Sequence, residues 1–195
     1  LGVTEQNIER YNYRDISLMD HAAAMVDSHY QIGFLNEHFR SSPRIIAFSN
    51  KRFYQNALQV MRERPWENQE SALAGRRCHG TRNEAGVNGK EIEAMIVDLE
   101  TLLHEASLPN AATAPTVGIL SPFRNQVEAI REAITTHFEN RDLNILLNRH
   151  QLLIGTAHSF QGEERDVMFL SFCVDNQVGH STLRFLERED VFNVS

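Results

Sequence analysis

The pattern of apolar and polar positions predicts helices that alternate with short buried strands. The clearest helix spans residues 88–106, where apolar side chains recur at spacings of three and four residues. Three short apolar runs are typical of buried strands: Val117–Leu120, Leu152–Ile154 and Val167–Val174. Helices and strands in alternation predict a three-layer α/β/α fold, with a mostly parallel sheet covered by helices on both faces.

The N-terminal part shows the same alternation less clearly. Apolar positions at residues 18–26 form a helical stripe, and Gln31–Phe39 is typical of a strand. Pro43 suits the first turn of a helix that we expect to end near Met61. In the polar stretch that follows, Ser71–Cys78 is a candidate for a short strand.

A further helix is predicted directly after the run Val117–Leu120. Ser121 is a suitable N-cap residue and Pro122 suits the first helical position. The chain contains no internal repeat and no low-complexity linker, so residues 1–195 are expected to form one domain.

Composition places the chain among ordinary globular proteins. Of its 195 residues, 42% are hydrophobic and 23% are charged, which argues against disorder, collagen and coiled coil. No apolar run approaches the ~18 residues of a membrane helix, so we expect no membrane partner. The two cysteines favour a reducing, intracellular location, the cytoplasm. Because the chain starts with Leu1, we expect it to be a piece of a longer protein.

The net charge of −7 hides an uneven distribution. Residues 40–90 carry ten Lys/Arg against four Glu, a net of +6, whereas the remainder has a net of −13. Most of the basic residues are arginines, whose planar guanidinium suits bidentate contacts with phosphate. The basic region is therefore either a phosphate-binding face or a solvated surface.

Several common site patterns are absent from the sequence. The segment 86–91 resembles the end of a P-loop around Lys90, but Glu84 replaces the required first glycine and Glu91 replaces the magnesium-binding Ser/Thr. Cysteines and histidines show no zinc-type spacing, so no metal site is expected. His158, Ser159 and Asp166 are triad residue types, but no Gly-x-Ser-x-Gly turn surrounds Ser159.

Three other segments place polar residues just after predicted strands: 37–54, 117–126 and 156–167. The carboxyl ends of strands are where open α/β sheets bind ligands. Each segment alone also has a structural explanation, since Arg40 could serve an ion pair, Ser121 a helix cap and Gly162 a turn. Their order and spacing along the chain make the signal stronger than any one of them.

These segments resemble motifs of the second RecA-like domain of superfamily 1 helicases. Residues 38–43, His-Phe-Arg-Ser-Ser-Pro, are similar to the family's Gln-Tyr-Arg-Met-His-Pro. Residues 121–126 are similar to its Thr-Pro-Tyr-x-x-Gln. Thr156–Asp166 is similar to motif V, Thr-Val-Asp-x-Phe-Gln-Gly-x-Glu-x-Asp. The resemblance, from about Ser17 to the end, is to the branch of P-loop NTPases that contains the nonsense-mediated-decay helicase and its replication relatives.

The resemblance implies ATP in a cleft between two RecA-like domains, and single-stranded DNA or RNA across both. Arg40 would then be catalytic, reaching the γ-phosphate. The ATP-binding residues would be Gln161, Gly162 and Glu164. The nucleic-acid-binding residues would be Ser121, Pro122, Arg124, Gln126, Thr156, His158 and Ser159. ATP and Mg²⁺ would act in the full-length protein, and this chain alone would bind neither of them. Its partner would be an N-terminal RecA-like domain.

Departures from the family pattern keep two alternatives open. His38, Ser41–Ser42, His158 and Asp190–Val191 replace typical family residues, and the sequence stops before the arginine of motif VI. One alternative is a degenerate, non-catalytic module that binds nucleic acid or protein. The other is a nucleotide-binding switch domain that does not translocate.

Overall fold

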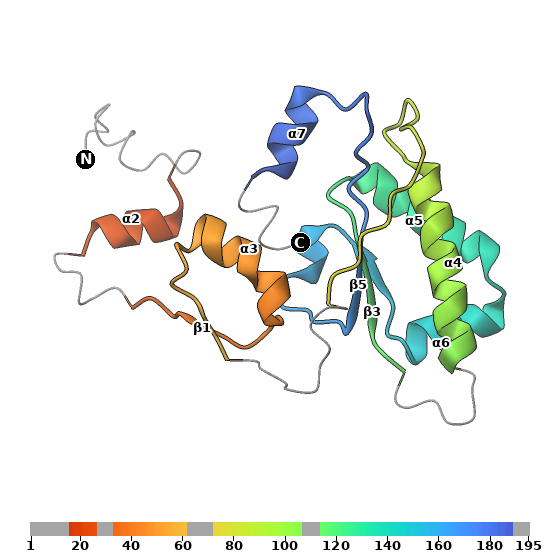
Figure 1. Ribbon diagram of the computed structural model, residues 1–195, viewed down its shortest axis with the longest axis horizontal. Helices are drawn as coiled ribbons and strands as arrows, with labels where there is room; N and C mark the ends of the chain where they lie inside the picture. Colours follow the sequence, from red (N-terminus) through yellow and green to blue (C-terminus); the bar gives the residue numbers. More distant parts are fainter. Residues whose placement is uncertain (1–15, 27–32, 62–71, 107–113, 189–195) are drawn as a thin grey trace, which may run out of the picture.

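The computed structural model describes residues 16–26, 33–61, 72–106 and 114–188 (Figure 1). Helices and strands alternate, and every strand pair is parallel, which confirms the α/β fold class expected for a RecA-like domain. In chain order, the elements are α2 (Leu18–Ala24), β1 (Glu37–His38), α3 (Pro43–Phe53), β2 (Gln59–Val60), α4 (Gly89–Ala106), β3 (Val117–Leu120), α5 (Arg124–His137), α6 (Asn140–Asn148), β4 (Leu153–Gly155), the 3-10 helix η3 (Ala157–Phe160), β5 (Val167–Leu170) and α7 (His180–Leu186).

The main sheet has the strand order β4-β3-β5. Ile119 of β3 lies opposite Ile154 of β4 and Phe169 of β5. Parallel neighbours require crossover connections, which α5 and α6 supply between β3 and β4. Helices α4, α5 and α6 lie together on one side of the sheet, whereas α3 and α7 lie on the other (Figure 1).

The core lies between the sheet and helices α4, α5 and α6. Its fully buried side chains include Leu99, Ile119, Ile130 and Leu146. All four residues of β3 are buried, which explains why the central strand has an uninterrupted apolar sequence. On the other face, Phe160 of η3 packs so closely that a Cβ on Gly118 would lie 2.8 Å from its ring. A glycine in the central strand therefore lets η3 approach the sheet.

The expectations for residues 88–170 hold with small shifts. The predicted helix 88–106 is α4, and the strand Val117–Leu120 is confirmed as β3. Strand β4 ends at Gly155, one residue later than expected, and β5 ends at Leu170 rather than at Val174. Helix α6 is an element that the sequence pattern does not predict.

The N-terminal expectations were partly wrong. The predicted helix from Pro43 to Met61 ends at Phe53, because Gln55 and Asn56 adopt left-handed φ values of 53° and 62°. The chain then forms β2, which pairs with β1. The predicted strand Gln31–Phe39 is reduced to β1, and its first two residues lie outside the described residues.

Four further expectations need correction or stay open. No strand forms over residues 72–78, although Ser71–Cys78 was a candidate. Ser121 is not the N-cap of α5, because the helix begins at Arg124 and Phe123 occupies the cap position. The segment Asp190–Ser195 lies outside the described residues, and the assignment of the whole chain to one domain stays a prediction.

Candidate functional site

The carboxyl ends of the main strands bring the second and third predicted motifs together. The Ser121 N–H, just after β3, donates to the carbonyl of Gly155 at 3.1 Å, at the end of β4. The Ser171 N–H, just after β5, donates to the carbonyl of Leu120 at 2.9 Å. The residues of these two motifs that follow Ser121 and Gly155 therefore start from one edge of the sheet, as the sequence predicts.

The tight turn after β4 exposes part of motif V at this edge. Thr156 occupies the N-cap position of η3 without a side-chain capping bond and is half-buried, whereas His158 and Ser159 are exposed. A side chain on Gly155 would overlap that of Ser159, so the glycine is needed for the turn to fold back. Gln161, which ends η3, is also exposed.

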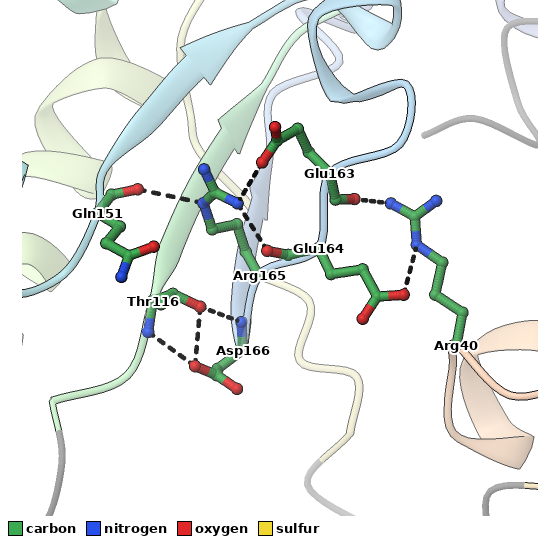
Figure 2. Close-up of polar contacts among 7 residues, drawn as sticks. All are labelled: Arg40, Thr116, Gln151, Glu163, Glu164, Arg165 and Asp166. Atoms are coloured by element: carbon green, nitrogen blue, oxygen red, sulfur yellow. Dashed lines mark hydrogen bonds and ion pairs between the residues drawn. The ribbon is translucent and has the colours of Figure 1, made fainter.

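Motif V then crosses to the opposite, amino edge of the sheet. Asp166, just before β5, accepts hydrogen bonds of 2.8 Å from both the N–H and the hydroxyl of Thr116, just before β3 (Figure 2). Arg165 donates from Nε to the carbonyl of Gln151 at 3.1 Å, just before β4. The end of motif V is thus anchored where the strands begin, and not at the carboxyl ends that the sequence predicts.

Arg40 reaches this second part of motif V from the first predicted segment (Figure 2). Its Nε lies 3.8 Å from Oε1 of Glu164, and its Nη2 donates to the carbonyl of Glu163. The Arg40 and Glu164 side chains are 49% and 66% exposed, so water screens the ion pair and its contribution to stability is small. The structure therefore brings together two of the predicted ATP residues without burying either.

Gly162 allows the loop between these two edges. Its φ of +83° is a left-handed conformation, and a Cβ at this position would meet no atom within 4 Å. Backbone geometry, rather than lack of room, therefore favours glycine here. The open space beside Gly162 leaves its backbone accessible to a ligand.

His38 supports the position of Arg40. Its Nε2 accepts a 2.9 Å hydrogen bond from the Ser41 N–H, which closes a turn around Arg40. Burial of the ring, and secondly the nearby charge of Arg40, lowers the pKa of His38. A neutral ring with an unprotonated Nε2 is the form that this hydrogen bond requires.

Two of the predicted nucleic-acid residues are buried. Ser121 and Gln126 are both 0% exposed. The Ser121 hydroxyl accepts from the Phe123 N–H at 3.2 Å. The Gln126 amide accepts from the Asn88 N–H at 2.9 Å and donates to the Asn88 carbonyl and the Ser171 hydroxyl. Their position in this chain suits holding the turn in shape, and neither offers surface to a ligand.

The same buried network joins α4 to the strand ends. Asn88 caps α4, since its Oδ1 accepts from the N–H of Lys90 and Glu91. The Glu91 carboxylate accepts from the Ser171 hydroxyl at 2.6 Å and from the Cys173 N–H at 3.2 Å. Burial, and secondly the Glu91 charge, raises the pKa of the Cys173 thiol to about 11. Glu91, which is incompatible with a P-loop, here has a structural role.

Pro122 and Arg124 line a cavity at the start of α5. Arg124 is exposed and Pro122 is half-buried, so both offer surface to a ligand. Within the described residues, no group of three or more His, Cys, Asp or Glu side chains is arranged to hold a metal ion. A search of the same residues finds no helix with the length and apolar character needed to cross a bilayer.

Comparison with known proteins identifies the family. The model of the AAA domain family matches residues 14–195, nearly the whole chain. The chain belongs to the AAA domain family. This AAA domain is 30% identical over 184 residues to a Danio rerio protein, mov-10-B.1, that carries the name of a helicase; the match covers 83% of the chain and 18% of that protein. It is 25% identical over 175 residues to the helicase SEN1 of Saccharomyces cerevisiae, covering 83% of the chain and 8% of SEN1.

These matches confirm that the AAA domain is a superfamily 1 helicase-like domain, of the branch that contains SEN1. A third relative, the MOV-10 protein of Gallus gallus, is 38% identical over 86 residues, which cover 43% of the chain and 9% of that protein. The AAA domain therefore spans less than a fifth of the length of these relatives.

Proposed function

We propose that this chain is the second RecA-like motor domain of an ATP-dependent superfamily 1 helicase. It would supply half of an ATP cleft and half of a track for single-stranded DNA or RNA, and an N-terminal RecA-like domain would supply the other halves. The observation that carries the proposal is the contact between Arg40 and Glu164, which joins two predicted ATP residues from distant segments. We also propose a cytoplasmic location, because two free thiols suit a reducing compartment.

Arg40 would act on the nucleotide by its charge. A guanidinium stays protonated at any physiological pH and spreads its charge over several donors, which suits the equatorial oxygens of a transferring phosphoryl group. Its partner Glu164 is a carboxylate that can accept hydrogen bonds from a ribose hydroxyl. Gly162 would allow close approach of the backbone, and Gln161 would couple the loop to the nucleotide.

The residues of this chain fit only one side of an ATP cleft. They offer a guanidinium and a carboxylate, but the sequence holds no P-loop, and the described residues hold no cluster for a metal ion. Mg²⁺ would neutralise charge on the phosphates when bound, and its ligands would come from the N-terminal domain. The contribution of this chain is therefore to position the nucleotide and to offset developing charge.

The nucleic-acid track would follow the carboxyl edge of the sheet. Thr156, His158 and Ser159 present hydroxyl and imidazole groups there, and Pro122 and Arg124 lie just after Ser121 on the same edge. Such groups make contacts with the sugar-phosphate backbone that do not depend on sequence, as a translocating motor needs. Ser121 and Gln126 would support these contacts by holding the turn after β3 in shape.

Binding of labelled single strands to the chain tests the track. Two or three phosphate contacts predict a plot of log affinity against log salt with a slope near 2, at about 0.7 per contact. A negative charge introduced by Ser159→Glu should weaken binding, whereas Thr136→Glu, on an exposed position of α5, should not. Firm binding with a slope near zero would contradict this track.

A degenerate, non-catalytic module remains the alternative, and one observation favours it. His158 is exposed at a position where the family has Asp, so any anionic role of that residue is lost. Strand-dependent ATP turnover of the full-length protein, measured with and without a His158→Asp change, distinguishes the two. A working motor should keep strand-dependent ATP turnover in both forms, whereas a degenerate module should show none in either.

A further inference from the structure

A cavity of about 420 Å³ lies between the loop 82–86, the start of α5 and helix α7. Its volume falls in the range of about 300–1,000 Å³ that is usual for small-ligand sites. The resemblance assigns only Pro122 and Arg124 among its lining residues, so the side chains from the loop and from α7 have no assigned role.

Two aromatic rings and one guanidinium form part of the wall. The centroids of Phe123 and Phe185 lie 5.8 Å apart, with their planes tilted by 47°. The guanidinium carbon of Arg82 lies 5.1 Å from the centre of the Phe123 ring. Aromatic faces and guanidinium planes are the surfaces on which nucleic-acid bases stack.

Arg82 is held in this position by its own loop and by Asp175. Its Nε donates to the carbonyl of Gly86 at 3.2 Å, and its backbone N–H donates to Asp175 at 2.7 Å. Gly86 has a φ of +80°, and a Cβ there would lie 2.7 Å from Arg82 Nη2. The glycine therefore provides the space that the guanidinium occupies.

The cavity is positively charged. Arg82 and Arg124 both line it, Ser181 and Thr182 add hydroxyls, and none of the lining residues is acidic. Asp175 does not line the cavity, and hydrogen bonds from the backbone of Arg82 and Gln177 lower the pKa of its carboxyl. A neutral apolar ligand would leave this charge unused, whereas a nucleotide offers both a flat base and a phosphate.

We propose that this cavity binds one nucleotide of the single strand, and this rests on the proposed function. The base stacks against Phe185, Phe123 and Arg82, and Arg124 contacts a phosphate. The strand is favoured over a free nucleotide because the cavity continues directly from the carboxyl edge of the sheet. Phe123 is two residues after Ser121, whose N–H bonds the carbonyl that precedes Thr156.

The experiment compares a labelled uridine 10-mer with an abasic 10-mer of the same charge, on the 195-residue chain. Because stacking of one base contributes a factor of about five or more, the wild type should bind the uridine strand at least roughly fivefold more tightly. Phe185→Leu, which keeps apolar packing, and Arg82→Lys, which keeps the charge, should both reduce this preference while the salt slope stays the same.

Matched controls lie outside the cavity. Phe48→Leu removes an exposed ring on α3, and Arg184→Lys changes an exposed arginine on α7 that does not line the cavity. Both should keep the full preference for the uridine strand. Arg124→Gln should lower the salt slope by about 0.7, one phosphate contact. If Phe185→Leu fails to fold, Arg82→Lys and the wild-type comparison of the two strands still test whether a base stacks in the cavity.

The other outcomes separate this proposal from the proposed function. Salt-dependent binding that is weakened by Ser159→Glu but is equal for both strands overturns the cavity alone. Loss of preference in the two controls as well as in the cavity variants also overturns it. Uridine monophosphate or inorganic phosphate that competes as tightly as the strand reassigns the cavity to free nucleotide. Absence of any strand binding overturns the cavity together with the track.

Discussion

Arg40 and Glu164 contact each other although they belong to different motifs at distant places in the sequence. The Nε–Oε1 distance is 3.8 Å, and the same guanidinium donates to the carbonyl of Glu163, 123 positions along the chain. Under the proposed function each partner would instead contact ATP. Nucleotide binding would therefore replace an exposed, screened ion pair, at little cost in free energy.

Arg40→Ala in the full-length protein should reduce ATP turnover by a factor on the order of 10³ or more, because it removes charge that stabilises the transferring phosphoryl group. Strand binding and melting temperature should stay nearly unchanged. Arg40→Lys should restore turnover poorly, since a point charge cannot reproduce the planar guanidinium. Steady-state turnover, strand binding and thermal melting on the same preparations measure all three.

Glu164→Gln provides the control for a purely structural ion pair. It should lower stability by less than about 1 kcal/mol, as should Glu128→Gln, which breaks the exposed pair with Arg131 on α5. Normal turnover of Arg40→Ala, combined with a clearly lower melting temperature, would refute the catalytic assignment and leave Arg40 with a structural role.

The 195-residue chain alone should hydrolyse no ATP. It contains no P-loop, and its described residues contain no metal-binding cluster, so the phosphates would lack most of their contacts. Phosphate release with and without single strands measures this. Strand-stimulated turnover, or calorimetry with low-micromolar ATP affinity, would show that the chain is more than half of a site.

Gln126→Leu should destabilise the chain by on the order of 3 kcal/mol, because the N–H and carbonyl of Asn88 lose their partner in a buried place. At about 2–4 °C per kcal/mol for a chain of this size, the melting temperature should fall by roughly 6–12 °C. Gln177→Leu, at an exposed position, should have little effect. Weakened strand binding without a stability change would instead support direct contact of Gln126 with nucleic acid.

The lowered pKa of His38 predicts a loss of stability in weak acid. Burial, and secondly the charge of Arg40, disfavours the protonated ring of His38 in the folded state. Below the ordinary histidine pKa of about 6.5, the unfolded state therefore binds more protons than the folded state. Stability from this group is thus present above that pH and falls as the pH falls. The test range runs from pH 7.5 to 5.5, about one pH unit on either side of the ordinary pKa of histidine. Over this range the melting temperature should decline less in His38→Gln than in the wild type.

His180→Gln, at the exposed start of α7, serves as the matched variant for His38. Its melting temperature should keep the pH dependence of the wild type. Identical pH dependence in His38→Gln and the wild type would show that the hydrogen bond from Ser41 does not depend on the charge of the ring.

The two thiols should differ in reactivity towards a thiol-specific reagent at mildly alkaline pH. Cys78 is half-buried, whereas Cys173 is 0% exposed, and its pKa is raised to about 11 by burial and by Glu91. Cys78 should therefore react in the native chain, and Cys173 only after denaturation, since the thiolate is the reactive form. Rapid modification of native Cys78→Ser would contradict the buried position of Cys173.

The sequence by itself determined the elements that depend on local pattern. Helix α4 and strand β3 follow from apolar spacing, because one face of a helix or a fully buried strand must be apolar. The order of the three motifs was enough to indicate the helicase-like family that the comparisons confirm. Local pattern did less well for α3, whose end depends on two left-handed residues, Gln55 and Asn56.

Only the tertiary structure decided which motif residues face solvent. Gln126 and Arg124 stand two positions apart in one motif, yet Gln126 is buried against Asn88 and Ser171 while Arg124 is exposed beside a cavity. The contact of Arg40 with Glu164 and the meeting of Phe123 with Phe185 likewise join distant segments. Such pairings are set by how the crossover connections bring strand ends and loops together, and no spacing along one segment contains that information.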